Sequence, residues 1–313
     1  MTNKIVNLSL KRCKEFRYGE NPHQKASFYL HTGDSPAFVH LGGKELSYNN
    51  LIDVDSGIRL VHEFEQPACV IIKHTDPCGV AVGKNIREAY TNAQACDPIS
   101  AFGGVVVLNR PLDAETAKKI SEIFVEVVAF PESNDDALSV FRDKNKKNVL
   151  LKVDLEKVLS QELEGIKSVL GGFAIQTQDS GMLKESELVF PTVRKPSKVE
   201  IDDMLFGFKV VKYLRSNAIA IVAENKLLGA GAGQTSRVEA VEQALKKSSG
   251  KYDHAVLISD GFFPFRDSID LAAKQGVKAV LQPGGSIKDQ EVIEACNESG
   301  MALAFSGKRA FRH

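Results

Sequence analysis

The 313-residue sequence predicts an α/β fold built from two halves. Short apolar runs typical of buried strands alternate with longer stretches in which apolar residues recur at helical spacing. A weakly patterned stretch, residues 155–200, ends in PTVRKPSK and is expected to link the halves. Strands that alternate with helices favour a sheet of mostly parallel strands. No residue-level repeat relates the halves, and a structural duplication stays open.

In the first half, four apolar runs predict buried strands at 68–72, 104–108, 127–130 and 149–153. Asp113 is a suitable N-cap for a helix that continues to about Phe124.

The second half has the clearer pattern, starting with apolar residues at helical spacing over 201–215. Strands are expected at 218–222, 227–233, 255–259, 278–282 and 301–305, with a turn at 224–226. The helices between them are expected at 236–247, 268–275 and 288–299.

Charge and hydropathy exclude two classes of partner. Lys and Arg number 40 and Asp and Glu number 40, so the chain lacks the positive charge of a protein that coats nucleic acid. An anionic ligand must therefore be held by locally placed cations. No apolar run approaches the ~20 residues that a membrane span needs, so neither nucleic acid nor a membrane is an expected partner.

The cysteines and the first residues indicate the compartment. Five cysteines are scattered without a CxxC pair, which is typical of reduced thiols and not of a disulfide framework or a zinc cluster. The start, MTNKIVNLSLKRCKEF, has no stretch resembling a secretory signal. A cytoplasmic location is expected.

Lys73 and His74 directly follow the predicted strand 68–72 and precede the turn-forming TDPCG. Side chains at the carboxyl end of a buried parallel strand face the crevice where α/β proteins bind ligands. A histidine there is suited to act as a general base, and the neighbouring lysine can face a phosphate or an oxyanion. The alternative is a pair of ordinary surface residues.

Other segments combine irregular backbone with recognition chemistry. RYGENPHQ (17–24) offers the planar guanidinium of Arg17 and the ring of Tyr18, and DPISAFGG (97–104) sets apolar side chains beside two glycines. SDGFFPFRD (259–267) carries three phenylalanines on a loop, and the chain ends in the basic and aromatic GKRAFRH. Each segment has an ordinary structural alternative: a turn for the first two, of which the second is more commonly a tight turn, a core cap for the third and a frayed end for the last.

Two better-known motifs are excluded. GAGAGQTSR (229–237) has Gln234 where the dinucleotide fingerprint requires its third glycine. A zinc deaminase needs H-x-E and P-C-x-x-C, but Pro77-Cys78 is followed by Gly79-Val80 and no H-x-E occurs at a suitable spacing. Zinc is therefore not expected.

Taken together, these segments resemble one family. RYGENPHQ, LSYNNLIDVDSG, VIIKHTDPCGVAVG, DPISAFGG, LRSNAIAIV, LGAGAGQTSR, SDGFFPFRD and KRAFRH occur in the order found in the formyltransferase part of the bifunctional purine-synthesis enzyme. That part is the 5-aminoimidazole-4-carboxamide ribonucleotide (AICAR) transformylase. The resemblance covers residues 14–313 and is weakest over 155–200.

The resemblance implies a pair of zinc-free, cytidine-deaminase-like α/β/α halves, which we expect at 1–195 and 196–313. It also implies a homodimer with active sites shared across the interface, and transfer of a formyl group from 10-formyltetrahydrofolate to the 5-amino group of AICAR. The family's inosine-monophosphate (IMP) cyclohydrolase domain has no counterpart before residue 17, so ring closure is expected to need a separate protein.

The resemblance also implies roles for individual residues. Lys73, His74 and Asn217 match the catalytic positions, with His74 as the general base and the other two as stabilisers of the transition state. The matches to nucleotide-binding positions are Arg17, Tyr18, Gly103, Arg309 and Phe311. Glu126 stands where some family members have an Asp that contacts the ribose, and it is expected to take part in binding the nucleotide. The matches to positions near the folate are Ile99, Phe102, Arg237, Phe262, Asp267 and Ser286.

Two other functions stay open: a nucleotide-binding regulatory module that has lost its chemistry, and a deaminase of a related heterocycle. The presence of all three catalytic matches favours the transferase. The sequence leaves open whether the donor is a standard folate or a modified pterin, whether the dimer is obligate, and whether a monovalent cation binds.

Overall fold

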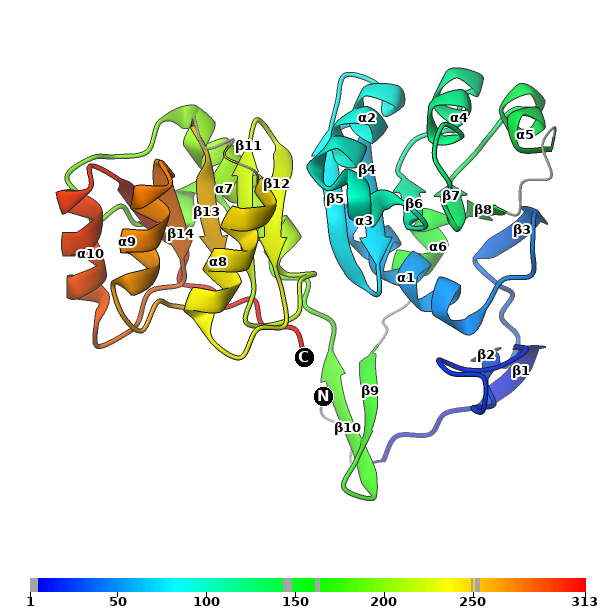
Figure 1. Ribbon diagram of the computed structural model, residues 1–313. Coiled ribbons are helices and arrows are strands. Elements are labelled where there is room, and N and C mark those ends of the chain that lie inside the picture. Colours follow the sequence, from blue (N-terminus) through cyan, green and yellow to red (C-terminus); the bar gives the residue numbers. More distant parts are fainter. Residues whose placement is uncertain (1–4, 143–147, 161–163, 249, 251–253) are drawn as a thin grey trace.

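The computed structural model describes residues 5–142, 148–160, 164–248, 250 and 254–313. One mixed sheet of eleven strands runs through the molecule in the order β15-β14-β13-β11-β12-β5-β4-β6-β7-β8-β3. Figure 1 shows two α/β lobes side by side, one from each half of the chain. The lobes join where β5 and β12 pair antiparallel.

The strands of the sheet are short and mostly buried. Those of the first half are β3 (Phe38–Gly42), β4 (Ala68–Lys73), β5 (Asp76–Val82), β6 (Val105–Leu108), β7 (Val127–Phe130) and β8 (Val149–Val153). Those of the second half are β11 (Ile219–Ala223), β12 (Lys226–Gly231), β13 (Val256–Ser259), β14 (Ala279–Gln282) and β15 (Ala302–Phe305).

Helices cover both faces of the sheet (Figure 1). Those of the first half are α1 (Tyr48–His62), α2 (Ile86–Cys96), α3 (Pro98–Ala101), α4 (Ala114–Ile120) and α5 (Asp135–Arg142). Those of the second half are α7 (Lys198–Val211), α8 (Arg237–Ser248), α9 (Asp267–Lys274) and α10 (Asp289–Glu298). No helix in the described ranges is long and apolar enough to cross a membrane.

Alternating side chains divide the core into layers, as the period of a strand requires. In β4, Val70 and Ile72 belong to a core cluster that extends through both halves beneath α1 and α7. Cys69 and Ile71 point to the other face, into a cluster formed with α2, α4 and α5. The second half has its own cluster on that face, beneath α8, α9 and α10.

The two halves repeat the same order of elements: a helix, a two-stranded hairpin, and three parallel strands that each follow a helix. Ser47 caps α1 and Ser197 caps α7. The number of residues between these two serines is the same as the number between Gly57 and Gly207. Both glycines approach the sheet closely: a Cβ would lie 2.5 Å from Val107 Cγ2 at the first and 2.4 Å from Ile258 Cδ1 at the second. The halves are therefore structural duplicates.

The expectation of a mostly parallel sheet is wrong. Only the outer strands β6, β7 and β8, and likewise β13, β14 and β15, run parallel. The hairpins β4–β5 and β11–β12, and their contacts with neighbouring strands, are antiparallel. Two-residue turns reverse the chain at His74-Thr75 and Glu224-Asn225, and so short a connection joins only antiparallel strands.

Two further expectations need correction. The helix capped by Asp113 ends at Ile120 instead of near Phe124. The stretch 155–200 is more than a linker, because it holds α6 (Leu155–Ser160), a hairpin of β9 (Glu164–Val169) and β10 (Gly172–Thr177), a 3-10 turn η1 (Glu185–Glu187) and the start of α7. Figure 1 shows the β9–β10 hairpin projecting beyond both lobes. β1 (Leu10–Glu15) and β2 (Ser27–His31) form a separate two-stranded antiparallel sheet.

Candidate functional site

Strand directions bring most of the predicted site residues to one edge of the large sheet. The β4–β5 turn with Lys73 and His74 lies at this edge, as do the loops that precede β6 and β7. In the second half, β12 pairs antiparallel with β5, and β11 pairs antiparallel with both β12 and β13. The start of β11 and the end of β13 therefore lie at this edge, together with the ends of β14 and β15, which run parallel to β13. We call this the site edge.

Lys73 ends β4 and His74 begins the two-residue turn to β5, so the pair lies at the end of a strand as expected. The expectation that this strand is parallel is wrong, because β4 pairs antiparallel with both of its neighbours. The Lys73 ammonium is half-buried and donates to the carbonyl oxygens of Phe102, at 2.9 Å, and Gly103, at 3.0 Å. His74 is exposed, with a backbone φ of 52°. Non-glycine residues adopt such values at a cost, so surrounding contacts must hold the turn.

Two residues of α1 hold that turn. Asp53 Oδ1 accepts a hydrogen bond from the Thr75 amide at 2.7 Å, and the Ser56 hydroxyl donates to the Thr75 carbonyl at 2.9 Å. Burial raises the pKa of Asp53, while the Thr75 bond and the charges of His74 and Lys73 act in the opposite direction. The predictions named neither Asp53 nor Ser56, although both belong to the motif LSYNNLIDVDSG.

Apolar side chains are exposed beside this turn. Ile99, on α3, is 88% exposed and Phe102 is 60% exposed, which is unusual for such large groups. The Phe102 ring lies 5.8 Å from that of Phe124, centroid to centroid. Gly103 has a φ of 67°, and a Cβ there would lie 3.2 Å from Lys73 Nζ, so glycine lets the lysine approach.

Glu126 lies at the start of β7, where its amide donates to the Gly104 carbonyl at 2.9 Å. Its carboxylate forms an ion pair with Lys44, which sequence reasoning missed because no spacing relates the two residues.

Asn217 precedes β11 at the same edge, and its amide group is bonded within the chain. Its Nδ2 donates to the carbonyls of Gln234, at 3.0 Å, and Thr235, at 3.3 Å. Its Oδ1 accepts from Arg237 at 2.7 Å. These bonds fix the side chain, but they also occupy the donor that the expected stabilising role requires.

Arg237 begins α8 and is only 8% exposed. Besides Asn217, its guanidinium contacts Ser259 Oγ, at 2.8 Å, and the fully buried carboxylate of Asp260. It was expected near a folate, and in this chain it holds Asn217 and neutralises Asp260. Asp260 was missed, and its position directly after the apolar run AVLIS was the available signal.

The end of the chain folds back onto the site edge, as Figure 1 shows in red. The Ala310 amide donates to the Asp260 carbonyl at 2.9 Å. The guanidinium carbon of Arg309 lies 4.5 Å from the centroid of the Phe311 ring. Phe311 packs on the backbone of Gly261, where a Cβ would lie 2.7 Å from the ring. Arg309, Phe311 and Phe262 are exposed, so all three can meet a ligand.

Contacts across the β5–β12 boundary tie the Lys73-His74 turn to the second half. Arg215 forms an ion pair with Asp76 at 2.6 Å. Arg312 donates to the Thr75 carbonyl at 3.1 Å, and its own carbonyl accepts from the Ser216 amide at 2.9 Å. Asn217 therefore directly follows Ser216, which is bonded to Arg312, and Arg312 in turn holds the turn through Thr75.

Arg17 and Tyr18 lie on a separate loop that packs against the start of α1. Gly19 donates to Gln24 within the loop, and the Asn49 side chain donates to the Glu20 carbonyl at 3.2 Å. Arg17 is exposed, and its guanidinium carbon lies 6.0 Å from the Tyr18 ring centroid.

Asp267 and Ser286 lie on loops after β13 and β14. Asp267 begins α9, and its carboxylate accepts from the Ser268 amide at 2.6 Å. The Ser286 hydroxyl accepts from the Lys288 amide at 3.1 Å. Each side chain thus stabilises its own loop.

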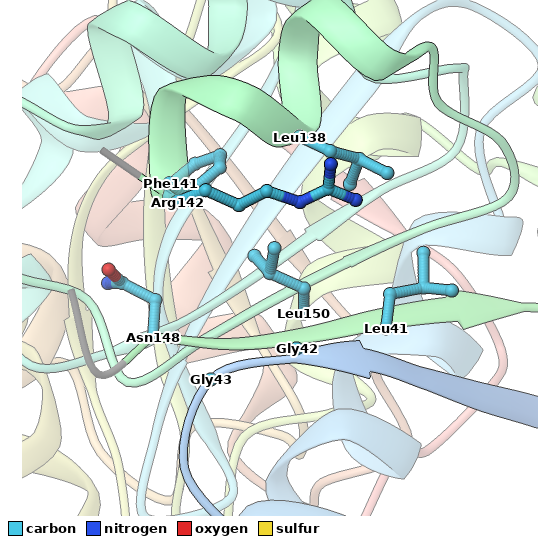
Figure 2. A pocket seen from close by; sticks show the side chains of 8 residues that line it. All are labelled: Leu41, Gly42, Gly43, Leu138, Phe141, Arg142, Asn148 and Leu150. Atoms are coloured by element: carbon cyan, nitrogen blue, oxygen red, sulfur yellow. The ribbon is translucent and has the colours of Figure 1, made fainter. Parts of the chain in front are cut away.

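A cavity of about 240 Å³ lies apart from these residues, between β3, β8 and α5, as Figure 2 shows. None of the predicted site residues lines it. Its lining consists of Leu41, Gly42, Gly43, Leu138, Phe141, Arg142, Asn148 and Leu150. Within the described ranges, no three or more His, Cys, Asp or Glu side chains gather as a metal site.

Comparison with known proteins identifies the family. The family model described as AICARFT/IMPCHase bienzyme matches residues 1–247. The bifunctional purine biosynthesis protein PurH of Clostridium perfringens (strain 13) is 47% identical over 311 residues, 98% of this chain and 60% of the relative. PurH of Caldicellulosiruptor bescii is 46% identical over 317 residues, 99% of this chain and 61% of the relative. The chain thus spans about 60% of the length of these relatives, and it belongs to the AICARFT/IMPCHase bienzyme family.

Proposed function

We propose that the chain is an AICAR formyltransferase that uses 10-formyltetrahydrofolate in purine biosynthesis. The observation that carries the proposal is the Lys73-His74 pair, presented at the site edge on a turn that contacts from both halves hold in place. Membership of a family whose relatives are named purine biosynthesis proteins supports the same conclusion.

The substrate amine is a weak nucleophile, because its lone pair is delocalised into an imidazole that bears a carboxamide. Its nitrogen attacks the formyl carbon and forms a tetrahedral centre with a negative oxygen and a positive amine. His74, exposed and facing solvent, accepts the amine proton; a base in this role contributes ~10²–10⁴ in rate. The bond from the formyl carbon to folate N10 then breaks, and N10 receives a proton.

Lys73 supplies positive charge to that centre. Its ammonium has three donors, and the carbonyls of Phe102 and Gly103 use two of them. The third can donate to the oxyanion or to N10, a contribution of ~2.7–4 kcal/mol for one such donor. Asn217 is the third catalytic residue in this proposal. Its Nδ2 must give up a hydrogen bond to a backbone carbonyl before it can donate to the substrate.

Exposed groups beside the turn provide binding. Arg17 and Arg309 would hold the phosphate, so that remote binding energy orients the reacting atoms. Tyr18, Gly103, Glu126 and Phe311 would complete the nucleotide site. Exposed Ile99, Phe102 and Phe262 would enclose the flat rings of the folate, with Asp267 and Ser286 as polar partners and Arg237 as the support of Asn217.

The spread of these residues supports a homodimer with shared sites. Six strands separate β7, beside Glu126, from β14, beside Ser286. The seven spacings between these strands, at about 4.8 Å each, give a distance along the edge of roughly 34 Å, which is too long for every residue to meet one substrate pair. A second copy would bring the nucleotide half of one chain to the folate half of the other, and exposed Leu170 and Phe173 on the β9–β10 hairpin offer apolar surface for it.

We extend the proposal to the fold class of the two halves and to the location of the protein in the cell. The halves, with a boundary at 195/196, are proposed to be zinc-free and cytidine-deaminase-like, as supported by their repeated helix–hairpin–strand order. The protein is proposed to act in the cytoplasm, and a monovalent cation is a candidate addition to the reaction buffer.

The test is to mix the purified chain with AICAR and 10-formyltetrahydrofolate and to follow tetrahydrofolate release. Release that requires both substrates supports the transferase. Binding of AICAR without release would indicate a regulatory module, and release of ammonia from an amino-heterocycle would indicate a deaminase; either result would overturn the proposal.

A further inference from the structure

The two halves carry matching carboxylates beneath matching turns. Asp53 on α1 and Asp203 on α7 have the same chain separation as the caps Ser47 and Ser197. Asp53 accepts from the Thr75 amide in the β4–β5 turn, and Asp203 accepts from amides in the β11–β12 turn. Both turns have two residues with positive φ. One function of each carboxylate is therefore to stabilise a strained turn.

The two carboxylates differ in how many oxygens that function uses. Asp203 uses both: Oδ2 accepts from the Glu224 amide at 3.0 Å and Oδ1 from the Asn225 amide at 2.7 Å. Asp53 uses only Oδ1, and among the described residues no hydrogen bond reaches its Oδ2. A neutral asparagine could hold the first turn equally well, so a carboxylate at position 53 offers more than the turn requires.

The charges around the two carboxylates differ as well. Asp203 is 1% exposed, and its nearest charged neighbours are the acidic Asp202 and Glu224. Asp53 is half-buried, and Lys73 and His74 lie close enough to act against the rise of its pKa, whereas Asp76 adds to that rise.

Two further cations face the same turn. Arg215 pairs with Asp76, and Arg312 bonds the Thr75 carbonyl. Asp53 therefore bonds a turn that basic side chains surround, next in the chain to the residues proposed to act on the substrate.

We infer that Asp53 is a positioning residue whose negative charge stabilises the His74 imidazolium formed during formyl transfer, beyond its bond to the Thr75 amide. This inference rests on the proposed function. When His74 accepts the amine proton, a nearby carboxylate lowers the energy of the resulting cation and thereby the barrier, and an amide cannot. At the matching turn Glu224 takes the position of His74, so Asp203 serves the fold alone.

The experiment compares Asp53→Asn with Asp203→Asn in the purified full chain. Asp53→Asn keeps the acceptor for Thr75 and loses the charge, so kcat should fall by at least about tenfold. The KM values should stay near those of the wild type, because binding does not use the charge, and the melting temperature should not fall, because the buried charge does not stabilise the fold. Asp203→Asn should lower the melting temperature, because one turn amide loses its acceptor, and should leave kcat unchanged.

Ser56→Ala is the second variant, because it loosens the same turn and keeps the Asp53 charge. Its kcat should stay close to the wild-type value. Wild-type kcat in Asp53→Asn, or an equal loss of kcat in Ser56→Ala, would overturn the inference while leaving the transferase in place. An inactive wild-type chain would overturn the proposed function together with the inference.

Discussion

The β4–β5 and β11–β12 turns are built alike and lie at opposite edges of one sheet. In each, two non-glycine residues adopt positive φ, at 52° and 67° in the first and at 53° and 55° in the second. An aspartate from the preceding helix bonds each turn. The first turn carries Lys73 and His74, whereas the second carries Glu224 and Asn225.

The two turns thus share a backbone scaffold, but only the first carries the residues proposed for catalysis. Beyond β13, Asp260 donates its amide to the Ala218 carbonyl; beyond β6, Asn109 donates its amide to the Ala68 carbonyl in the same way. Asp260 then engages Arg237, while the Asn109 side chain bonds only nearby backbone groups. At the opposite edge Asn109 thus makes only neutral bonds, whereas Asp260 at the site edge carries a charge that pairs with Arg237.

The largest expected effect comes from His74→Ala, which should lower kcat by ~10²–10⁴ because the general base is lost. Glu224→Ala is the matched control, since it makes the same truncation at the corresponding strained position. Steady-state assays of both variants should show loss in the first alone. Similar kcat values in the two would remove the distinction between the turns.

Among the ion pairs of Arg237 and Arg266, the buried Arg237–Asp260 pair at the site edge should contribute most to the free energy of unfolding. Arg237→Met leaves Asp260 buried without its cation and should lower the free energy of unfolding by ~3–5 kcal/mol. Arg266→Met breaks two exposed pairs, with Asp270 and with Glu298, and should still cost less than the loss of the buried pair. Urea unfolding of both variants checks the contrast, and equal losses would contradict it.

The duplicated glycines should respond alike. Gly57→Ala and Gly207→Ala each force a Cβ against a branched side chain of the sheet, and each should cost ~1–3 kcal/mol by overpacking. Thermal unfolding measures the loss, and kcat should be unchanged in both. If one variant were neutral in stability, the packing of the two helices would not be equivalent.

The smallest effect concerns pH. Burial raises the folded-state pKa of Asp53 above the ordinary value of 3.8, so the folded state binds its proton more tightly than the unfolded state does. The contribution of Asp53 to stability is therefore full below that value and is lost as pH rises through the raised pKa. Relative to the wild type, Asp53→Asn should gain stability across this window. Unfolding measured from pH 3 to pH 7 tests the sign, and a relative loss would contradict it.

The strands and helices of the second half were predictable, because each is a compact apolar run bounded by a turn. The antiparallel pairing was not, since periodicity does not reveal strand direction, and the sheet order depends on contacts between distant segments. The sequence left the duplication open because few residues repeat, such as Asp53 with Asp203 and Gly57 with Gly207. Motif order pointed to Lys73 and His74, but the partners of Asn217 and Glu126 depend on folding alone.

The most direct test of the account is to follow backbone amide resonances while AICAR is added to the isotope-labelled protein. The account predicts large shifts at 73–76, in the turn that carries Lys73 and His74, and none at 223–226. Equal shifts at both turns, or shifts confined to the second, would contradict the claim that only one of the two duplicated turns meets the substrate.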